Sequence, residues 1–550
     1  MKRILFVIPP HGSFESYMPS GAGKKKNFLT PPYGALSIIS YANEDKEHDI
    51  QIFDCNKYIF EHLDSHCLES STFNELCRTV LFYKPDYIFV SALFNTSFPH
   101  MKIIGLMKVA CPNTIVFVGG GLATNLYKEL FDEFPDIDAI CFGEGEIPVK
   151  KLLDFDVSIE ELHKISPAWI TKNSFARGCV PKHDMIEDID DIPLIDYSYI
   201  DFEKYNGRSY IDKDPKSNKI ELSIHTSRGC PFNCVFCANS SVHGKRVRMM
   251  SFKRVAETIR HYRDKYGVTI LMVEDDHFLY NKKRALEILK YIRNNKINVE
   301  FPNGIAVYKI DNDIAKALAD AKVRVITLAI ESGSDYVLKQ LIDKPLTVKK
   351  IKEVVGILKQ YDIRIHAFIV IGLPGESDED RKETLETVIE LGVDWVYVFI
   401  AIPIVGSRLY TLCDEKGYLI NRDYGNHFVA NGNIRAPGVE PEDIEEYAYY
   451  MNTIINFIFN SNFLNRKYDV AEEYFLNVVR SYPEQAIAHY MLSILYRKTE
   501  RYDKSNEHYQ KYCIYYDKHL APYKNSKYWQ NLLKNIIFGC NEGVSYGERF

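Results

Sequence analysis

The sequence predicts an α/β protein with three parts: a doubly wound parallel sheet, a partial (βα)6 barrel and an α-helical carboxyl-terminal region. Three observations support this prediction. Apolar runs alternate with helical segments through the first part of the chain, six more strand–helix units follow, and a fixed offset relates two segments near the end. A chain of 550 residues exceeds what one hydrophobic core usually supports, so several domains are expected.

The first part covers residues 1–150. Its predicted strands are RILFVIPP, DIQIFDC, PDYIFVSAL, TIVFVGGG and AICFGEGE, and helical segments separate them. Apolar runs between helices are typical of parallel strands that are covered on both faces. We therefore expect a Rossmann-like sheet whose ligand lies outside the carboxyl ends of its strands.

Residues 151–205 are acidic, contain Pro193 and show no sustained period, so they predict a linker. Residues 206–425 resume the alternation. The predicted strands are KIELSIHTS, TILMVED, VEFPNGIAV, VITLAIES, RIHAFIVIGLPG and WVYVFIAIP. Six successive units predict a closed or nearly closed barrel whose strand ends surround one site.

Residues 426–550 predict a helical region. The segments YDVAEEYFLNVVRSYPEQ and YDKSNEHYQKY align with Tyr468 opposite Tyr502, which is the 34-residue period of tetratricopeptide (TPR) repeats. The TPR-like repeat is expected over about residues 465–515. Only one full period is visible, whereas three repeats are usually needed for stability, so these helices need support from a neighbouring domain. A helical cover on the barrel is favoured over a surface that recognises a peptide or carrier protein.

Composition and charge predict a cytoplasmic protein. The net charge is −6, which does not favour nucleic-acid binding, and no apolar run approaches the length of a membrane span. The amino-terminal run is broken by two prolines and suits a buried strand better than a signal peptide. Twelve cysteines over this length do not form a disulfide framework.

Cys230, Cys234 and Cys237 follow a predicted strand in TSRGCPFNCVFCANS and suggest a compact metal site. Zinc is one interpretation, with His225 or His243 as a fourth ligand. Chance clustering of buried cysteines is another. The favoured interpretation is a 4Fe–4S cluster with three irons held by the protein and one left open for reaction.

The segment CPFNCVFC resembles the signature of the radical S-adenosylmethionine (SAM) superfamily. The segments EDD, AIESGSDYVLKQLIDKPLT, AFIVIGLPGES and IPIVGSRLY follow in the order of the family's SAM-contacting elements. The resemblance implies that SAM binds the open iron and is cleaved to a 5′-deoxyadenosyl radical, with electrons from a flavodoxin or ferredoxin. It implies these SAM contacts: Phe236, Glu274, Asp275, Asp276, Glu331, Ser332, Gly372 and Glu376.

The first part resembles a cobalamin-binding module through TPPYGALSIISYA, KPDYIFVSAL, VFVGGGLAT and AICFGEGE. The D-x-H-x-x-G motif that supplies a cobalt ligand is missing, and His11 is expected on a solvated loop. Cobalamin without a protein histidine is therefore expected, and a vestigial module is the alternative. The resemblance implies these cobalamin contacts: Pro10, Ser91, Asn95, Gly119, Gly120, Gly121, Gly143, Glu144, Gly145 and Glu146.

Together the two resemblances imply a cobalamin-dependent radical SAM methyltransferase. A methyl group would pass from SAM through methylcobalamin to an unactivated carbon, or a phosphinate phosphorus, of a small-molecule or peptide substrate. Alternatives are cyclisation, rearrangement or oxidation without methyl transfer, tRNA methylthiolation, and a non-catalytic scaffold with a structural cluster. Tyr308 and Tyr410 are candidates for lining the cavity, and neither is assigned a catalytic role.

Overall fold

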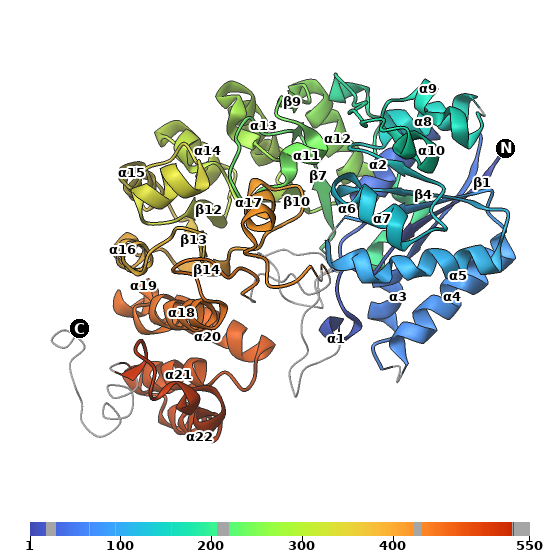
Figure 1. Ribbon diagram of the computed structural model, residues 1–550. Helices are drawn as coiled ribbons and strands as arrows, with labels where there is room; N and C mark the ends of the chain where they lie inside the picture. The colour runs from blue at the N-terminus through green and yellow to red at the C-terminus, as the bar shows by residue number, and fades with distance from the viewer. Residues whose placement is uncertain are drawn as a thin grey trace.

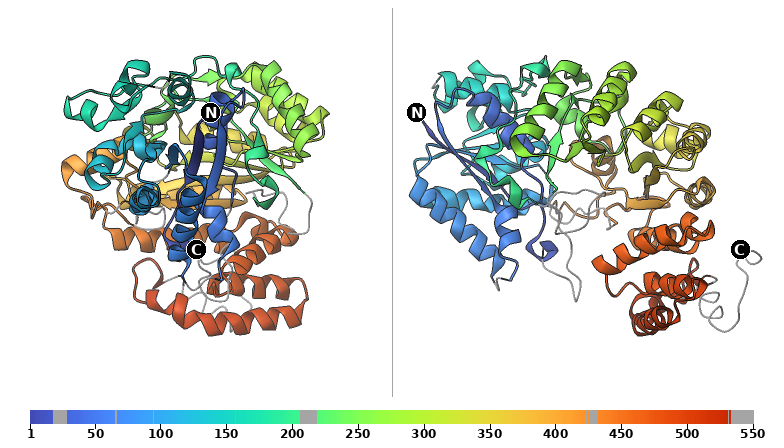
Figure 2. Two further views of the ribbon diagram at one scale, coloured as in Figure 1. Left: turned by 90° about the vertical axis from the view of Figure 1, so that its right-hand side faces the viewer. Right: turned by 180° about the vertical axis from the view of Figure 1, so that it is seen from behind.

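The computed structural model describes residues 1–17, 29–64, 67–93, 95–155, 157–205, 219–422, 424, 432–530 and 532. The three parts are distinct in space. The first sheet and its helices lie beside the six-stranded barrel, and the carboxyl-terminal helices pack below the barrel (Figure 1). The sheet and the helical region flank the barrel on different sides when the molecule is turned (Figure 2).

The first domain is built on a six-stranded sheet with the order β2-β1-β3-β4-β5-β6. The first five strands are parallel, and β6 runs antiparallel to β5. The order reverses at β1, so the switch point where such sheets bind ligands lies between the carboxyl ends of β1 and β3. The strands are β1 (Arg3–Ile8), β2 (Asp49–Asp54), β3 (Tyr87–Ser91), β4 (Ile115–Gly119), β5 (Ala139–Cys141) and β6 (Trp169–Thr171).

Helices cover both faces of this sheet, as the doubly wound prediction requires. One face buries the stacked rings of Phe6, Phe89 and Phe117 under α2, α8 and α9. The other face packs against α3, α4, α5 and α7. The helices are α1 (Phe14–Tyr17), α2 (Tyr33–Ala42), α3 (Cys55–Glu61), α4 (Leu68–Tyr83), α5 (Ile103–Ala110), α6 (Gly121–Asn125), α7 (Tyr127–Glu133), α8 (Glu146–Phe155) and α9 (Leu162–Ile165).

Residues 151–205, which we expected to be irregular, contain regular structure. They include the end of α8, then α9, β6 and α10 (Lys172–Ala176). β6 adds an antiparallel strand to the first sheet, where the Trp169 ring packs 5.2 Å from the Phe117 ring. The prediction missed β6 because a three-residue strand is too short to show an alternating pattern.

The barrel has the six strands that the sequence predicts. They form two parallel three-stranded sheets, with orders β11-β10-β7 and β12-β13-β14. A parallel bridge from Ile305 to Leu328 joins the two sheets. Within the described chain, β7 and β14 are the outer strands of the series, so the barrel is partial. The strands are β7 (Glu221–Ile224), β10 (Ile270–Val273), β11 (Asn298–Glu300), β12 (Val325–Glu331), β13 (Arg364–Ile371) and β14 (Trp395–Ile400).

Amphipathic helices surround the barrel and bury their apolar faces against the strands. Several begin at a side-chain cap, such as Ser251 for α12 and Thr347 for α15. The elements between and after the strands are β8 (Ser227–Arg228), α11 (Asn239–His243), β9 (Arg248–Met249), α12 (Phe252–Tyr266), α13 (Lys282–Asn294), α14 (Asn312–Asp320), α15 (Val348–Leu358), α16 (Asp378–Leu391) and α17 (Arg408–Lys416).

The carboxyl-terminal helices pack on the outer barrel strand β14. The Asn456 side chain bonds both the N–H and the carbonyl of Val396, and the rings of Trp395 and Tyr474 stack at 5.3 Å. α20 and α22 begin 34 residues apart, which is the predicted offset, whereas the TPR-like repeat itself stays a prediction. The elements are α18 (Pro441–Thr453), the π-helical η10 (Ile454–Ile458), α19 (Ser461–Leu464), α20 (Tyr468–Ser481), α21 (Ala486–Lys498) and α22 (Tyr502–His519).

The helical region has its own hydrophobic core, which includes Phe475, Leu492 and Trp529. These helices therefore pack against one another as well as against the barrel. Nowhere in the described chain is a helix both long enough and apolar enough to cross a membrane.

Candidate active site at the junction of two domains

The three cysteines lie on the loop that joins β8 to α11. All three are free thiols; Cys230 and Cys234 are half-buried. The barrel holds the middle of the loop, because Val235 donates its N–H to the Ile342 carbonyl at 2.8 Å and accepts from the Leu409 N–H at 2.7 Å. Burial raises the pKa of Cys234 to about 12, so a bound cation is needed to keep this sulfur as a thiolate at neutral pH.

The two histidines considered as zinc ligands have other partners. The His225 ring packs 4.7 Å from the Tyr33 ring, and His243 Nδ1 lies 2.7 Å from Glu144 Oε1. Over the residues described, no three His, Cys, Asp or Glu side chains are grouped to hold one metal ion. A cubane instead takes each cysteine at a different iron, and soft thiolates suit it. The donor set therefore fits a 4Fe–4S cluster with one open iron.

The acidic segment after β10 holds the strand that enters the cysteine loop. Asp275 accepts hydrogen bonds from the Thr226 N–H at 2.5 Å, the Thr226 hydroxyl at 2.5 Å and the Ser227 hydroxyl at 2.8 Å. Asp276 Oδ2 accepts from the Gly229 N–H at 2.6 Å. Burial raises the pKa of Asp275 to about 6. Both oxygens of Asp275 thus accept hydrogen bonds within the chain, and a contact of this residue with SAM stays a prediction.

Glu274 is half-buried, and its Oε1 accepts from the Ser223 hydroxyl at 2.6 Å. Phe236, within the cysteine loop, is half-buried and packs on the barrel core. For both residues a contact with SAM stays a prediction.

The segment at the end of β12 brings a carboxylate and a lysine close to the cysteine loop. Glu331 has a φ of 65°, unusual for a residue other than glycine, and its Oε1 lies 2.8 Å from Lys344 Nζ. Lys344 acts electrostatically on Cys230 and Cys234, where it opposes the rise in thiol pKa. The sequence analysis missed Lys344, although it lies within the quoted segment.

Two further predicted SAM contacts have internal hydrogen bonds. Ser332 Oγ lies 2.9 Å from the Thr384 hydroxyl on α16. Glu376 accepts from the Gly372 N–H at 2.5 Å, and burial raises the Glu376 pKa to about 7. Both side chains are almost fully buried. Glu376 Oε1 is buried without a hydrogen-bond partner among the described residues, and the SAM contacts of both residues stay predictions.

Aromatic side chains gather beside the cysteine loop. His277 Nε2 lies 2.5 Å from the Tyr308 hydroxyl, and the Phe232 ring packs 5.4 Å from Tyr308 and 5.8 Å from His277. Tyr308 therefore lies at the mouth of the barrel, as expected, with His277 as a partner that the sequence analysis missed. The Tyr410 hydroxyl is 3.3 Å from that of Tyr424, outside this group.

The carboxyl ends of β1 and β3 offer an apolar surface at the switch point. Leu93 is 56% exposed just after β3, and a Cβ at Gly34 would meet no atom within 4 Å. Such an open apolar face fits a flat macrocycle. Ser91 ends β3, Asn95 begins the next helical turn, and the Pro10 carbonyl accepts from the Ser97 hydroxyl. Cobalamin contacts of these three residues stay predictions.

His11 lies at the same switch point, directly after β1. It is half-buried, and its N–H donates to the Tyr17 hydroxyl and to Asn56 Oδ1, both at 2.9 Å. Burial lowers its pKa to about 4, so the ring is neutral at pH 7. The expectation of a solvated loop histidine is therefore wrong.

The predicted glycines have tight contacts within the chain. Gly120 has a φ of 98°, and a Cβ there would lie 2.4 Å from the Ala92 carbonyl oxygen. A Cβ at Gly143 would lie 2.5 Å from His183 Nδ1, and one at Gly145 would lie 2.6 Å from Ile38. Gly121 faces the Leu93 carbonyl, and Gly119 lies near Cys141. Close packing of the loops requires glycine at Gly120, Gly143 and Gly145, and the cobalamin contacts of these glycines stay predictions.

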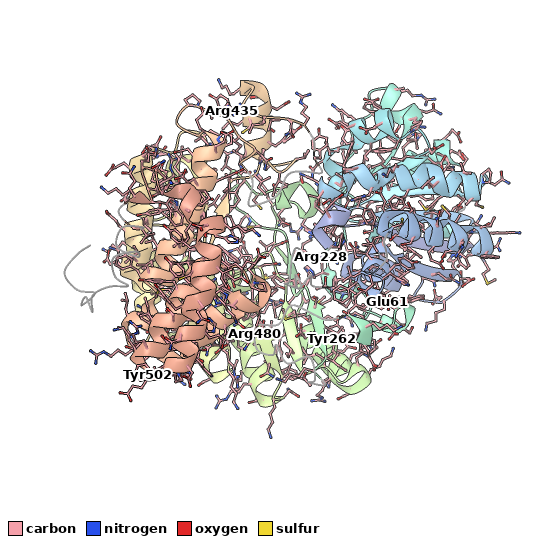
Figure 3. All side chains as sticks on the ribbon, turned by 90° about the horizontal axis from the view of Figure 1, so that it is seen from below. Glu61, Arg228, Tyr262, Arg435, Arg480 and Tyr502 are labelled. Carbon is pink, nitrogen blue, oxygen red and sulfur yellow. The ribbon has the colours of Figure 1, made fainter. Side chains whose placement is uncertain are left out.

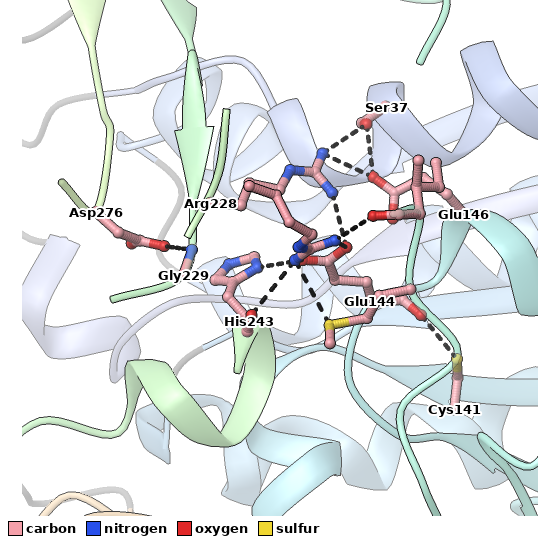
Figure 4. A network of polar contacts seen from close by, with 11 residues as sticks. Ser37, Cys141, Glu144, Glu146, Arg228, Gly229, His243 and Asp276 are labelled. Carbon is pink, nitrogen blue, oxygen red and sulfur yellow. Dashed lines mark hydrogen bonds and ion pairs between the residues drawn. The ribbon is translucent and has the colours of Figure 1, made fainter. Parts of the chain in front are cut away.

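Glu144 and Glu146 form ion pairs with arginines of the barrel domain, and their contact with cobalamin stays a prediction. Arg228 Nη2 lies 2.8 Å from Glu146 Oε1, and Arg228 Nη1 lies 3.2 Å from Glu144 Oε2 (Figure 4). Arg248 binds both oxygens of Glu144, at 2.5 and 2.9 Å. Burial alone would raise the pKa of Glu144, but Arg228, His243 and Arg248 outweigh it and hold that pKa well below its usual range.

These arginines were missed by the sequence analysis. Figure 3 shows Arg228 between the two domains. A second contact joins the domains at IPIVGSRLY, where a Cβ at Gly406 would lie 2.2 Å from Asn125 Oδ1 on α6. α6 also packs against α11, which follows the cysteine loop. The cysteine loop and the loops at the carboxyl edge of the first sheet therefore meet at one junction.

Comparisons with known proteins agree with this geometry. Residues 224–388 match the model of the radical SAM superfamily, and residues 22–153 match that of the B12 binding domain. An uncharacterized methyltransferase of Pyrococcus horikoshii, PH0819, is 28% identical over 77% of this chain and 85% of its own length. The cytidylyl-2-hydroxyethylphosphonate methyltransferase of Streptomyces wedmorensis is 25% identical over 70% of this chain and 77% of its own length.

The structure of the radical SAM methyltransferase TsrM from Kitasatospora setae, solved with cobalamin and a [4Fe-4S] cluster, has the same fold. Its TM-score is 0.56 at 15% identity, over 76% of this chain and 79% of that one. The fold, the site and the two domain matches together indicate a radical SAM domain joined to a B12-binding domain. The cofactors of the chain are a 4Fe–4S cluster, SAM and cobalamin.

Proposed function

We propose that the protein is a cobalamin-dependent radical SAM methyltransferase that moves a methyl group from SAM, by way of cobalamin, to an unactivated carbon or phosphorus of its substrate. The observation that carries this proposal is the junction itself. α6, at the carboxyl edge of the B12-binding sheet, packs against both α11 and the loop that contains Gly406. A group bound at that edge would therefore face the mouth of the barrel.

In this proposal the barrel domain binds the cluster, and the first domain binds the corrin. Cys230, Cys234 and Cys237 would hold the cluster, and the exposed Leu93 would lie under the corrin. When bound, the cluster supplies the electron that cleaves SAM, and cobalamin carries the methyl group. The aromatic group of buried His277 and half-buried Phe232 and Tyr308 would exclude water beside the cysteine loop.

A small-molecule substrate is the simplest partner for a site enclosed by two domains. We also propose a cytoplasmic location and a flavodoxin- or ferredoxin-type reductant, because a reducing compartment protects such a cluster. The helical region would act as a cover on the barrel, which is supported by the Asn456 and Tyr474 contacts with β13 and β14.

The test is anaerobic reconstitution with iron, sulfide and hydroxocobalamin, followed by gel filtration and incubation with SAM and a strong reductant. We expect retained corrin, S-adenosylhomocysteine from methyl transfer and 5′-deoxyadenosine from radical formation. The matched control is the chain with all three cysteines replaced by alanine. 5′-Deoxyadenosine without S-adenosylhomocysteine would contradict methyl transfer and favour cyclisation, rearrangement or oxidation.

A further inference from the structure

A single carboxylate of the B12-binding domain contacts both ends of the cysteine loop. Arg228 precedes Cys230 by two residues, and His243 ends the helix that follows Cys237. Arg228 Nη1 lies 3.2 Å from Glu144 Oε2, and His243 Nδ1 lies 2.7 Å from Glu144 Oε1 (Figure 4). The loop that would carry the cluster is thus closed by a residue from the neighbouring domain.

Residues 226–229, which lead into the cysteine loop, are hydrogen-bonded in turn by side chains of the barrel domain and of the B12-binding domain. In the barrel domain, Asp275 accepts hydrogen bonds from Thr226 and Ser227, and Asp276 accepts one from the Gly229 N–H. Between them, Arg228 donates to Glu144 and Glu146 of the B12-binding domain. Gly229 has a φ of 88°, and a Cβ there would lie 2.3 Å from the Arg246 carbonyl oxygen. This stretch therefore has little room to shift without breaking a buried contact.

Stability alone is a poor explanation for these charges. Glu144, Glu146, Arg228 and Arg248 are each at most 6% exposed. A buried ion pair loses the hydration of both charges, and apolar side chains of similar size are often as stable or more so. The best-attested use of such groups is to fix one alignment of the elements that carry them. Here those elements are the turn after β5 and the cysteine loop.

We infer that Glu144 is a positioning residue that fixes the cluster-binding loop relative to the B12-binding domain, and so sets the distance between cluster and corrin. This inference rests on the proposed function only for the expected change in the rate of methyl transfer relative to SAM cleavage. Reductive SAM cleavage needs the barrel alone, whereas methyl transfer to the corrin needs both domains in register. Loss of the Glu144 contact should therefore impair the second reaction far more than the first.

The test variant is E144M/R248M in the full-length, reconstituted protein. It removes one negative and one positive charge together, leaves the Arg228–Glu146–Ser37 contacts in place and avoids an unpaired buried charge. The matched control is R364M/E473M, which removes a two-point ion pair between β13 and α20. E144D keeps the charge but shortens the side chain. It is compared with the parent protein in place of the double variant if the double variant does not fold.

The first readout is magnetic coupling, by electron paramagnetic resonance, between the reduced cluster and the one-electron-reduced corrin. We expect weaker and more variable coupling in E144M/R248M at unchanged iron and corrin content, with an intermediate result in E144D. The control should match the parent protein. Unchanged coupling in both Glu144 variants would overturn the inference, whatever reaction the enzyme catalyses.

The second readout is the ratio of S-adenosylhomocysteine to 5′-deoxyadenosine. We expect this ratio to fall by about tenfold or more in E144M/R248M, since a displacement of about 1 Å can cost on the order of 100-fold in rate. An equal loss of both products would indicate a merely structural role and contradict the inference. If the parent protein forms no S-adenosylhomocysteine, the proposed function fails, and the coupling measurement still tests the positioning role.

Discussion

Asn456 is expected to hold the carboxyl-terminal helices on the barrel. Its side chain accepts from the Val396 N–H at 2.8 Å and donates to the Val396 carbonyl at 2.7 Å, with both residues about 1% exposed. The amide thereby replaces the neighbouring strand that the outer strand β14 lacks in the described chain. Asn456→Leu would leave one buried donor and one buried acceptor without a partner.

Each unsatisfied buried group costs about 1–3 kcal/mol, so the loss of both should destabilise the docked helices by about 2–6 kcal/mol. Asn456→Asp would set a buried carboxylate against the Val396 carbonyl, so it should destabilise the docked helices at least as much. Trp395 is a suitable fluorescent reporter because it stacks on Tyr474 across this contact. Urea unfolding followed by fluorescence should show an earlier first transition in Asn456→Leu.

The matched control is Asn506→Ala on the exposed side of α22, where truncation leaves no buried group unsatisfied. Its unfolding curve should overlay that of the parent protein. If the first transition of Asn456→Leu coincides with that of Asn506→Ala, the two hydrogen bonds do not hold the helices on the barrel.

Three further outcomes follow from the structure. Alanine at Cys230, Cys234 or Cys237 should abolish both the broad absorbance near ~400 nm and SAM cleavage, and surviving cleavage in any variant would exclude that cysteine as a ligand. Leu93→Glu should lower retained corrin by about tenfold or more at unchanged iron content, because an exposed apolar contact is replaced by a charge; equal corrin content would exclude the switch-point site. Burial lowers the His508 pKa to about 4, below that of the unfolded chain, so acidification from pH 6.5 to 4 should destabilise the helical region in urea titrations; His508→Gln should reduce that dependence and leave the part that belongs to the neighbouring His489, whose pKa burial also lowers.

Much of the fold could be predicted because its strands are long and apolar. Five parallel strands of the first sheet and all six barrel strands stand where apolar runs predict them. The three-residue β6 was missed, since no period is visible over so short a segment. The 34-residue offset between Tyr468 and Tyr502 reappears as the spacing between the starts of α20 and α22, whereas the TPR-like repeat stays a prediction.

Some residues of the candidate site could be predicted from nearby sequence, whereas others depend on contacts with distant parts of the chain. Three cysteines within one loop are a local pattern, and their chemistry follows from their spacing. Asp275 and Glu376 lie in the expected segments, but their hydrogen bonds turn them into supports for the loop and the turn. A sequence segment indicates where a side chain lies along the chain, whereas its orientation depends on which buried donors need an acceptor.

The ion pairs between the domains show why some functional residues leave no sequence signal. Glu144 and Arg228 are separated by 84 positions, and neither belongs to a repeating pattern. A charged residue near a strand end is usually solvated, so composition favours the surface for both. Only the packing of the B12-binding domain against the barrel domain removes water from these ion pairs, so that each charge depends on its partner. The turn that contains Glu144 therefore has ion-pair partners in the barrel domain, which its sequence alone does not indicate.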